Sequence, residues 1–397
     1  MTITTFTTLT TLTLLAACSS PVVPVQVPTD TGTSTPTDSI EDVVLVAQDS
    51  QEFSEAASLL QGGDVDGDGL SDVGLVLDNS VLAWAQSTAE GVETPRNLLP
   101  DGLLATLIEE AMDSSGSSAT TVFVQGLQLV DLGGDGRSEW LVTASVEIDT
   151  VYSLLTVLLS DPMGQVSLEL VGPGEHLTQA VSDLDGDGQP ELVLFGEESA
   201  VYTSGGSVWP LGDAVDWNYY PQVAAMDLDG SGGRDLVVFL NGGFGVSEIH
   251  TFYQENDALS PGLVYQDLFA NEAKLTAVSD GEQEALLLTG TQVLRFNQEG
   301  LFEEVGGANN FYIGVEGDLD GDQKLDLIQL TAPQPALYAS GPEGPLTLVS
   351  FEGPKTSLDT ALVLDLDGDG RQDLVGVRWD NENSTSLLES WLNASGE

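Results

Sequence analysis

Basic side chains are scarce in this sequence. It has 9 Lys and Arg residues against 64 Asp and Glu residues, which gives a formal net charge of −55 at pH 7. Phosphate groups are held mainly by Lys and Arg, so this balance excludes binding to nucleic acid or to an anionic membrane surface through charge. Histidine is also rare, and neither His176 nor His250 lies in a motif for metal binding or nucleophilic catalysis. We therefore expect a protein that is not an enzyme.

Cysteine is nearly absent, since Cys18 is the only one, and this excludes a disulfide framework. Cys18 ends the run LAAC after a Thr- and Leu-rich stretch whose size and small-residue ending are typical of a signal peptide. The stretch is too short for a membrane span, which needs about 20 mostly apolar residues. The run resembles the lipobox of bacterial lipoproteins, which implies that residues 1–17 are removed and Cys18 is lipidated. The alternative is an ordinary signal peptide in which Cys18 is incidental.

Long helical periodicity is missing from most of the remaining chain. Residues 18–39 are rich in Pro, Thr and Ser and predict a flexible linker after the cysteine. From residue 40 to 397, short apolar runs alternate with Gly, Asp and Asn, a pattern that predicts β-strands. One exception is the segment 101–112, where the apolar residues share one helical face. The sequence thus predicts an all-β fold with one short helical insertion.

A nine-residue acidic motif recurs along residues 40–397. Its copies begin at spacings of 67, 52, 44, 53, 38 and 47 residues, and each copy is followed by strand-like runs. Their first residues are Asp64, Asp131, Asp183, Asp227, Asp280, Asp318 and Asp365. Seven units of about 50 residues, each with three or four strand signals, predict a seven-bladed β-propeller. The strand-like run 42–47 precedes the first unit, and we expect it to pair into the last blade and remove an open edge.

The motif carries oxygen side chains at positions 1, 3, 5 and 9 and glycines at positions 4 and 6 in its fullest copies. Glycines allow a tight curl of the backbone, and clustered hard oxygen atoms suit Ca²⁺, which takes 6–8 oxygen ligands. An EF-hand is excluded because position 12 is not Glu and strands follow the loop. The alternative is that the aspartates form only Asx-turns that hold a hairpin.

The motif followed by an apolar run resembles the FG-GAP/VCBS repeats of integrin α-chain type propellers. This resemblance covers about residues 40–397 and implies that each loop joins the first two strands of a blade and binds Ca²⁺. The implied ligands are Asp64, Asp66, Asp68, Asp72, Asp183, Asp185, Asp187, Glu191, Asp227, Asp229, Ser231, Asp235, Asp318, Asp320, Asp322, Asp326, Asp365, Asp367, Asp369 and Asp373. A weaker site is expected at Asp131, Asp135 and Glu139, and none at Asp280. The total would be about four to six structural calcium ions.

Aromatic residues gather in one stretch between two units, at Trp209, Trp217, Tyr219 and Tyr220. Exposed rings of this kind suit contact with a carbohydrate or a protein. The alternative is that they pack between blades.

Together these features predict a lipid-anchored propeller in a bacterial cell envelope, attached to the membrane only through its lipid. We expect a binding or adhesion module for a protein or glycan ligand. Two alternatives remain open at this stage: a polysaccharide-active enzyme, either lyase or hydrolase, and a structural component of an envelope assembly.

Overall fold

A computed structural model gives the structure of the chain. It describes residues 43–395 except for residues 101, 112–118, 149–150, 161–166, 171–176, 182, 197–198, 205, 213–220, 232, 241–246, 256–257, 269–274, 280–283, 289–291, 297–301, 307–313, 322–325, 331–334, 342–343 and 349–350. The chain divides into two compact units, residues 1–38 and 39–397, and every described residue belongs to the second. The expected signal peptide, Cys18 and the linker lie outside the described residues. No helix in the described part of the chain has the length and apolar character to cross a membrane.

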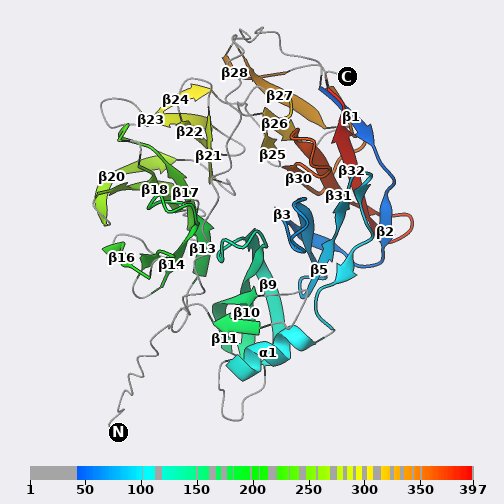
Figure 1. Ribbon diagram of the computed structural model, residues 1–397, viewed down its shortest axis with the longest axis horizontal. Helices are drawn as coiled ribbons and strands as arrows, with labels where there is room; N and C mark the ends of the chain where they lie inside the picture. The colour runs from blue at the N-terminus through cyan, green and yellow to red at the C-terminus, as the bar shows by residue number, and fades with distance from the viewer. Residues whose placement is uncertain are drawn as a thin grey trace. The chain divides into compact units, whose positions relative to one another are not determined.

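The described chain is almost entirely β-structure (Figure 1). It forms six sheets of four strands, one sheet of six strands and one two-stranded ribbon. Within each four-stranded sheet, the strands follow one another along the chain and pair antiparallel.

The first three sheets cover residues 57–210. The first contains β3 (Ala57–Gly63), β4 (Asp72–Leu77), β5 (Val81–Ala85) and β8 (Arg96–Asn97). The second contains β9 (Ala119–Val130), β10 (Glu139–Ile148), β11 (Val151–Ser160) and β12 (Ser167–Leu170). The third contains β13 (Leu177–Val181), β14 (Glu191–Phe195), β15 (Ala200–Tyr202) and β16 (Val208–Pro210). The ribbon contains β6 (Ser87–Thr88) and β7 (Gly91–Val92).

The next three sheets cover residues 222–348. The fourth contains β17 (Gln222–Met226), β18 (Asp235–Leu240), β19 (Ser247–Gln254) and β20 (Leu259–Leu268). The fifth contains β21 (Leu275–Ser279), β22 (Glu284–Leu288), β23 (Gln292–Phe296) and β24 (Phe302–Gly306). The sixth contains β25 (Gly314–Gly317), β26 (Asp326–Gln329), β27 (Ala336–Gly341) and β28 (Gly344–Leu348).

The last sheet combines strands from both ends of the described chain. It contains β1 (Val43–Ala47), β2 (Gln51–Phe53), β29 (Phe351–Glu352), β30 (Thr360–Leu364), β31 (Asp373–Asp380) and β32 (Thr385–Asn393). β1 pairs antiparallel with β32 and parallel with β29, and Figure 1 shows β1 in blue beside β32 in red. This pairing confirms the prediction that the first strand joins the last repeat, and it covers an edge of β32.

Consecutive sheets pack through apolar faces, because strand residues alternate between the two sides of a sheet. Trp84 of the first sheet and Trp140 of the second lie in one buried cluster, and Leu75 of the first and Val375 of the last lie in another. The first strands of neighbouring sheets also contact each other, from β30 to β3, β9, β13, β17 and β21 in turn, while β25 contacts β30 and β24 contacts β28. The seven sheets therefore form a closed series, in which the last sheet contacts the first through β30 and β3.

The helix α1 (Leu103–Ala111) lies where the 3.6-residue pattern predicts it. Leu104 and Ile108, four residues apart and therefore on one helical face, are buried in the cluster formed by the first two sheets. The helix contacts β9 and β12.

Candidate metal centres

Each acidic loop lies at the same joint of its sheet, between the first strand and the second. The loops connect β3 to β4, β9 to β10, β13 to β14, β17 to β18, β25 to β26 and β30 to β31. This is the position that the resemblance implies. Asp280, the start of the expected empty copy, lies outside the described residues.

The structure gathers the acidic side chains of five loops into compact groups. In each group, ligand atoms from at least three carboxylates lie within 4.8 Å of one another. The groups are Asp64, Asp66 and Asp72; Asp183, Asp185, Asp187 and Glu191; Asp227, Asp229 and Asp235; Asp318, Asp320 and Asp326; and Asp365, Asp367 and Asp373. Among the described acidic residues, the loop that begins at Asp131 does not form such a group; its third position is Gly133.

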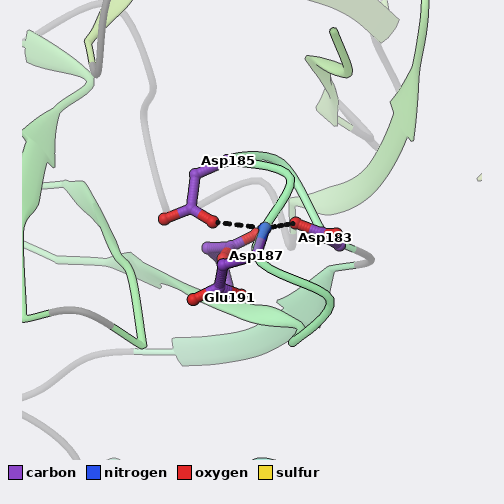
Figure 2. Close-up of side chains that lie close together, drawn as sticks. All are labelled: Asp183, Asp185, Asp187 and Glu191. Atoms are coloured by element: carbon purple, nitrogen blue, oxygen red, sulfur yellow. Dashed lines mark hydrogen bonds between the residues drawn. The ribbon is translucent and has the colours of Figure 1, made fainter. Parts of the chain in front are cut away.

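The loop at Asp183 brings all four expected side chains together (Figure 2). The Asp187 backbone N–H donates to carboxylate oxygens of Asp183 and Asp185, both at 3.1 Å. Asp183 also accepts hydrogen bonds from the N–H groups of Gly186 at 2.6 Å and Gly188 at 2.8 Å. Gly188 has φ +88°, a conformation that L side chains rarely adopt. These bonds are Asx-turns, so the local hydrogen bonds alone account for the curl of the loop.

The ninth position of the loop is buried, which Asx-turns do not explain. Glu191 is 0% exposed, and its Oε2 atom accepts a hydrogen bond from the backbone N–H of Leu184. Its Oε1 atom is buried and has no hydrogen-bond partner among the described residues. Oδ1 of Asp326, in the same position of another loop, is also buried without a partner there. An unsatisfied buried acceptor costs about 1–3 kcal/mol, and more when it is charged.

In three other loops, both oxygens of the ninth-position carboxylate are used. One oxygen of Asp72 accepts from the N–H of Val65 at 3.0 Å, and the other accepts from Ser87 N at 2.9 Å. Asp235 and Asp373 repeat this arrangement, with third-strand donors Gln254 at 2.9 Å and Asn393 at 2.7 Å. The ninth carboxylate therefore ties the loop to the third strand of its sheet at Asp235 and Asp373, and to β6, which follows the third strand, at Asp72.

Burial raises the pKa of the ninth-position carboxyl groups in the metal-free loops. It raises the pKa of Asp72 and Asp373 to about 6, that of Glu191 to about 7 and that of Asp326 to about 8. The pKa of Asp235 is raised for the same reason. Repulsion from the other carboxylates of each loop adds to the effect of burial, and backbone hydrogen bonds oppose it.

Sequence reasoning missed the second position of the loops. This position is Val or Leu in six of the seven copies, and its side chain is buried in five loops, at Val65, Leu184, Leu228, Leu319 and Leu366. Its backbone N–H is also the donor to the ninth-position carboxylate. The Val or Leu that directly follows the first aspartate in six copies was the signal that could have identified it.

The fifth position differs between loops. Ser231 Oγ accepts from the N–H of Gly233 at 3.2 Å, and Asp187 accepts a hydrogen bond from the Ser204 hydroxyl. Asp369 is paired with the guanidinium of Arg371 at 2.5 Å, which lowers the pKa of that carboxyl. Asp322 lies outside the described residues.

Neighbouring loops touch one another. The Ser138 N–H donates to the Asp64 carbonyl at 2.6 Å, and the Asp318 N–H donates to Gln372 Oε1 at 2.6 Å. A Cβ atom at Gly67 would lie 2.6 Å from Arg137 Nε, so the seventh-position side chain of one loop covers the fourth-position glycine of the loop before it. The acidic loops of consecutive sheets therefore form a connected series.

Three of the four aromatic residues that were expected to contact a ligand are not described by the structure. Trp217, Tyr219 and Tyr220 lie outside the described residues. Trp209 is 3% exposed and lies in a buried cluster shared by the third and fourth sheets, so its ring packs between sheets. His250 is buried on β19, where its Nε2 lies 3.0 Å from Glu248 Oε2.

The residues present fit a hard divalent cation. Each group offers oxygen atoms alone, and this donor chemistry suits Ca²⁺ better than softer metals. Glu191 Oε1 and Asp326 Oδ1 are buried and have no hydrogen-bond partner among the described residues. This is a second, independent sign, because a bound cation would compensate the charge of a buried carboxylate.

Comparison with known proteins identifies the class of fold. No protein-family model matches the sequence, and no curated protein sequence matches it. The structure is similar to that of BBS1N in complex with ARL6DN, soaked with lead, with TM-score 0.53 and 12% identity over 88% of this chain and 97% of that chain.

Two further neighbours are more distant. One is an Agrocybe aegerita lectin that recognises non-reducing terminal N-acetylglucosamine, with TM-score 0.44 and 14% identity over 85% of this chain and 88% of that chain. The other is the Bacillus licheniformis rhamnogalacturonan lyase PL11, with TM-score 0.43 and 12% identity over 89% and 84% of the two chains. The BBS1N structure has a β-propeller-like fold, and a likeness at 12% identity shows the fold alone.

Proposed function

We propose that this chain is an extracytoplasmic, calcium-binding, seven-bladed β-propeller of FG-GAP/VCBS type that acts as a binding or adhesion module. The observation that supports it best is the repetition of one acidic group at the same joint of five sheets. The six four-stranded sheets and the last sheet would be the seven blades, and the pairing of β1 with β32 would close the ring.

Calcium would be held by the carboxylates of the five groups, with Asp68, Asp369, Ser231 and Asp322 as further oxygen donors in their loops. The ion would supply positive charge to side chains that otherwise repel each other. It would also give the buried Glu191 and Asp326 oxygens a partner. Because the groups are assembled only in the folded chain, calcium would stabilise that state by mass action. Its role is therefore structural.

The chemistry of the described acidic loops supports a binding role more than a catalytic one. A catalytic metal site keeps a base beside the metal and an open coordination position. In the loop at Asp183, the four carboxylates instead accept hydrogen bonds from the loop's own backbone. No observation on the described side chains favours the polysaccharide-active enzyme or the structural component of an envelope assembly over a binding module.

The proposal includes attachment to a bacterial cell envelope through lipid on Cys18. It rests on the LAAC run and on the Pro- and Thr-rich segment that follows it. Expression in a bacterial host would test it: the chain should partition into detergent with the membrane lipids, and Cys18→Ser should not. Equal partition of the two chains would remove the anchor from the proposal.

Metal content is the direct test of the calcium sites. The purified chain, equilibrated with calcium and passed through a desalting column, should retain about four to six ions as measured by elemental analysis. Glu191→Gln should retain about one ion fewer. Exposed Glu90, which lies outside the acidic groups, offers Glu90→Gln as the matched control, and it should retain the full number. A chain that retains no calcium would contradict the sites.

A further inference from the structure

A cavity of about 650 Å³ lies at the first strands of several sheets, away from the acidic groups. Its wall is contributed by β3, β9, β10, β13, β17 and β21, five of which are the first strands of their sheets. Figure 1 labels these strands. The volume falls within the range of about 300–1,000 Å³ that is common for small-molecule sites.

The wall of the cavity carries no charge, although the chain has a net charge of −55. All thirteen described residues that line it are uncharged. The polar side chains are amides and hydroxyls, and five of them are glutamines: Gln61, Gln125, Gln128, Gln179 and Gln222. None of these thirteen residues is aromatic, so the wall presents amide groups and aliphatic surface to an occupant.

Two of the glutamines each make two hydrogen bonds to the neighbouring sheet, and a third, Gln222 of β17, accepts from Leu275 N of β21 at 2.7 Å. Gln128 of β9 accepts from Ala180 N at 2.8 Å and donates to Ala180 O at 3.5 Å. Gln179 of β13 donates to Pro221 O at 2.6 Å and accepts from Val223 N at 3.1 Å. An amide has two N–H donors and two acceptor lone pairs. Beyond these two bonds to described residues, Gln128 and Gln179 each have one further donor and one further acceptor position.

A β-bulge places another glutamine at the cavity. Between β9 and β10, Gly126 pairs with Thr143 and Val124 pairs with Ala144, which leaves Gln125 without a partner in the ladder. Bulges re-aim side chains and are common beside binding sites. Gln125 is exposed and lines the cavity.

From these features we propose that the cavity binds a neutral, polyhydroxylated ligand, a mono- or disaccharide unit without carboxylate or sulfate. Fixed amides pair with sugar hydroxyls because both groups donate and accept hydrogen bonds. The aliphatic side chains of Leu127, Leu141 and Val223 offer apolar surface to the C–H faces of a sugar ring. An anionic sugar is disfavoured, because no described residue in the wall offers it a positive charge. The proposal deepens the binding role proposed above and depends on it.

Isothermal titration calorimetry on the calcium-loaded full chain tests this proposal. The probes are lactose, cellobiose and N,N′-diacetylchitobiose as neutral disaccharides, with digalacturonic acid as the anionic counterpart. At least one neutral disaccharide should bind, and digalacturonic acid should bind at least about tenfold more weakly. Gln125→Glu, which places a negative charge in the wall, should weaken the neutral ligand by about tenfold.

Gln48→Glu provides the matched control, because Gln48 does not line the cavity and its side-chain amide donates to the nearby, exposed Val46 carbonyl. It should bind the neutral disaccharide as the original chain does. The cavity proposal is overturned if no neutral disaccharide binds, if digalacturonic acid binds equally well, or if Gln125→Glu leaves the affinity unchanged.

Two outcomes would contradict the cavity without contradicting the broader binding role. A glycan or protein that binds with the same affinity to the original chain and to Gln125→Glu contradicts the cavity and leaves the binding role intact. A chain whose calcium content and melting temperature are as expected, but which binds none of the disaccharides, contradicts the cavity alone.

Discussion

At the scale of single residues, the ninth carboxylate of each acidic loop combines a structural bond with an unfavourable charge. Its link to the second-position N–H fixes the loop, while its burial opposes ionisation. The positions of the acids were predicted from the sequence. The burial of the ninth side chain was not, because it depends on how the second and third strands cover the loop.

Glu191→Gln tests this conflict at the loop where all four side chains meet. Glutamine keeps the shape and removes the buried charge, so the metal-free chain at pH 8 should gain about 1–3 kcal/mol of unfolding free energy. The same substitution removes a calcium ligand, so the rise in melting temperature on adding calcium should become smaller. Urea unfolding with and without calcium measures both effects.

Glu90→Gln controls for the loss of one negative charge from an acidic chain. Glu90 is exposed and lies outside the acidic groups, so its substitution should leave the calcium effect unchanged. If Glu191→Gln destabilises the metal-free chain, the buried charge of Glu191 does not lower the stability of the fold as we infer.

The raised pKa values of the ninth carboxyl groups give a pH dependence to the metal-free chain. A carboxyl whose pKa is higher in the folded state binds more protons when folded, so stability falls as pH rises. For Asp72, Asp373, Glu191 and Asp326 this loss should extend from about pH 4 through about pH 8. Thermal melting in chelator should therefore show a higher transition temperature at pH 5 than at pH 8.

Calcium should reverse this trend, because the ion binds carboxylates only after they lose their protons. The increase in melting temperature caused by calcium should grow from pH 5 to pH 8. A chelated chain that is more stable at pH 8 than at pH 5 would show that these groups do not dominate its pH response.

At the scale of elements, most strands and the helix could be predicted, because their patterns are local. The apolar runs in the sequence at 192–195, 236–240 and 285–288 lie within β14, β18 and β22. The segment 101–112, whose apolar residues share one helical face, contains α1. The amide bonds from Gln128 and Gln179 to the next sheet could not be predicted. They join residues 52 and 44 positions apart, and nothing local marks them.

The strand β1 offers a test of how the last sheet is closed. Leu45 is buried and pairs with Asn393, whereas the next residue, Val46, is 47% exposed. Leu45→Ala should cost about 2–3 kcal/mol of unfolding free energy, as buried leucines usually do. Val46→Ala should cost less than about 0.5 kcal/mol. Urea unfolding of both variants measures the difference, and equal values would mean that β1 contributes little to the sheet.

The amide bonds between sheets give a second test at this scale. Gln179→Met keeps a side chain of similar length but leaves Val223 N and Pro221 O without their partner. We expect a loss of about 1–3 kcal/mol in unfolding free energy. Gln48→Met is the control, since its bond is exposed and local, and it should change little. No loss in Gln179→Met would show that water replaces the amide at this position.

At the scale of the whole molecule, the large negative charge opposes the compact state. The five acidic groups concentrate part of that charge, and contacts such as Ser138 to Asp64 connect one loop to the next. Calcium at these groups would reduce repulsion at several joints between strands. We therefore predict that the ions stabilise the fold as a whole.

The most direct test of this claim is the thermal unfolding of the chain at pH 7.5 to 8 in millimolar calcium and in excess chelator, with magnesium at equal concentration as the control for ionic strength. We predict a transition in calcium at least about 10 °C higher than in chelator, with a much smaller effect of magnesium, which prefers rigid octahedral sites and retains its water. Coincident transitions in calcium and in chelator would contradict the account.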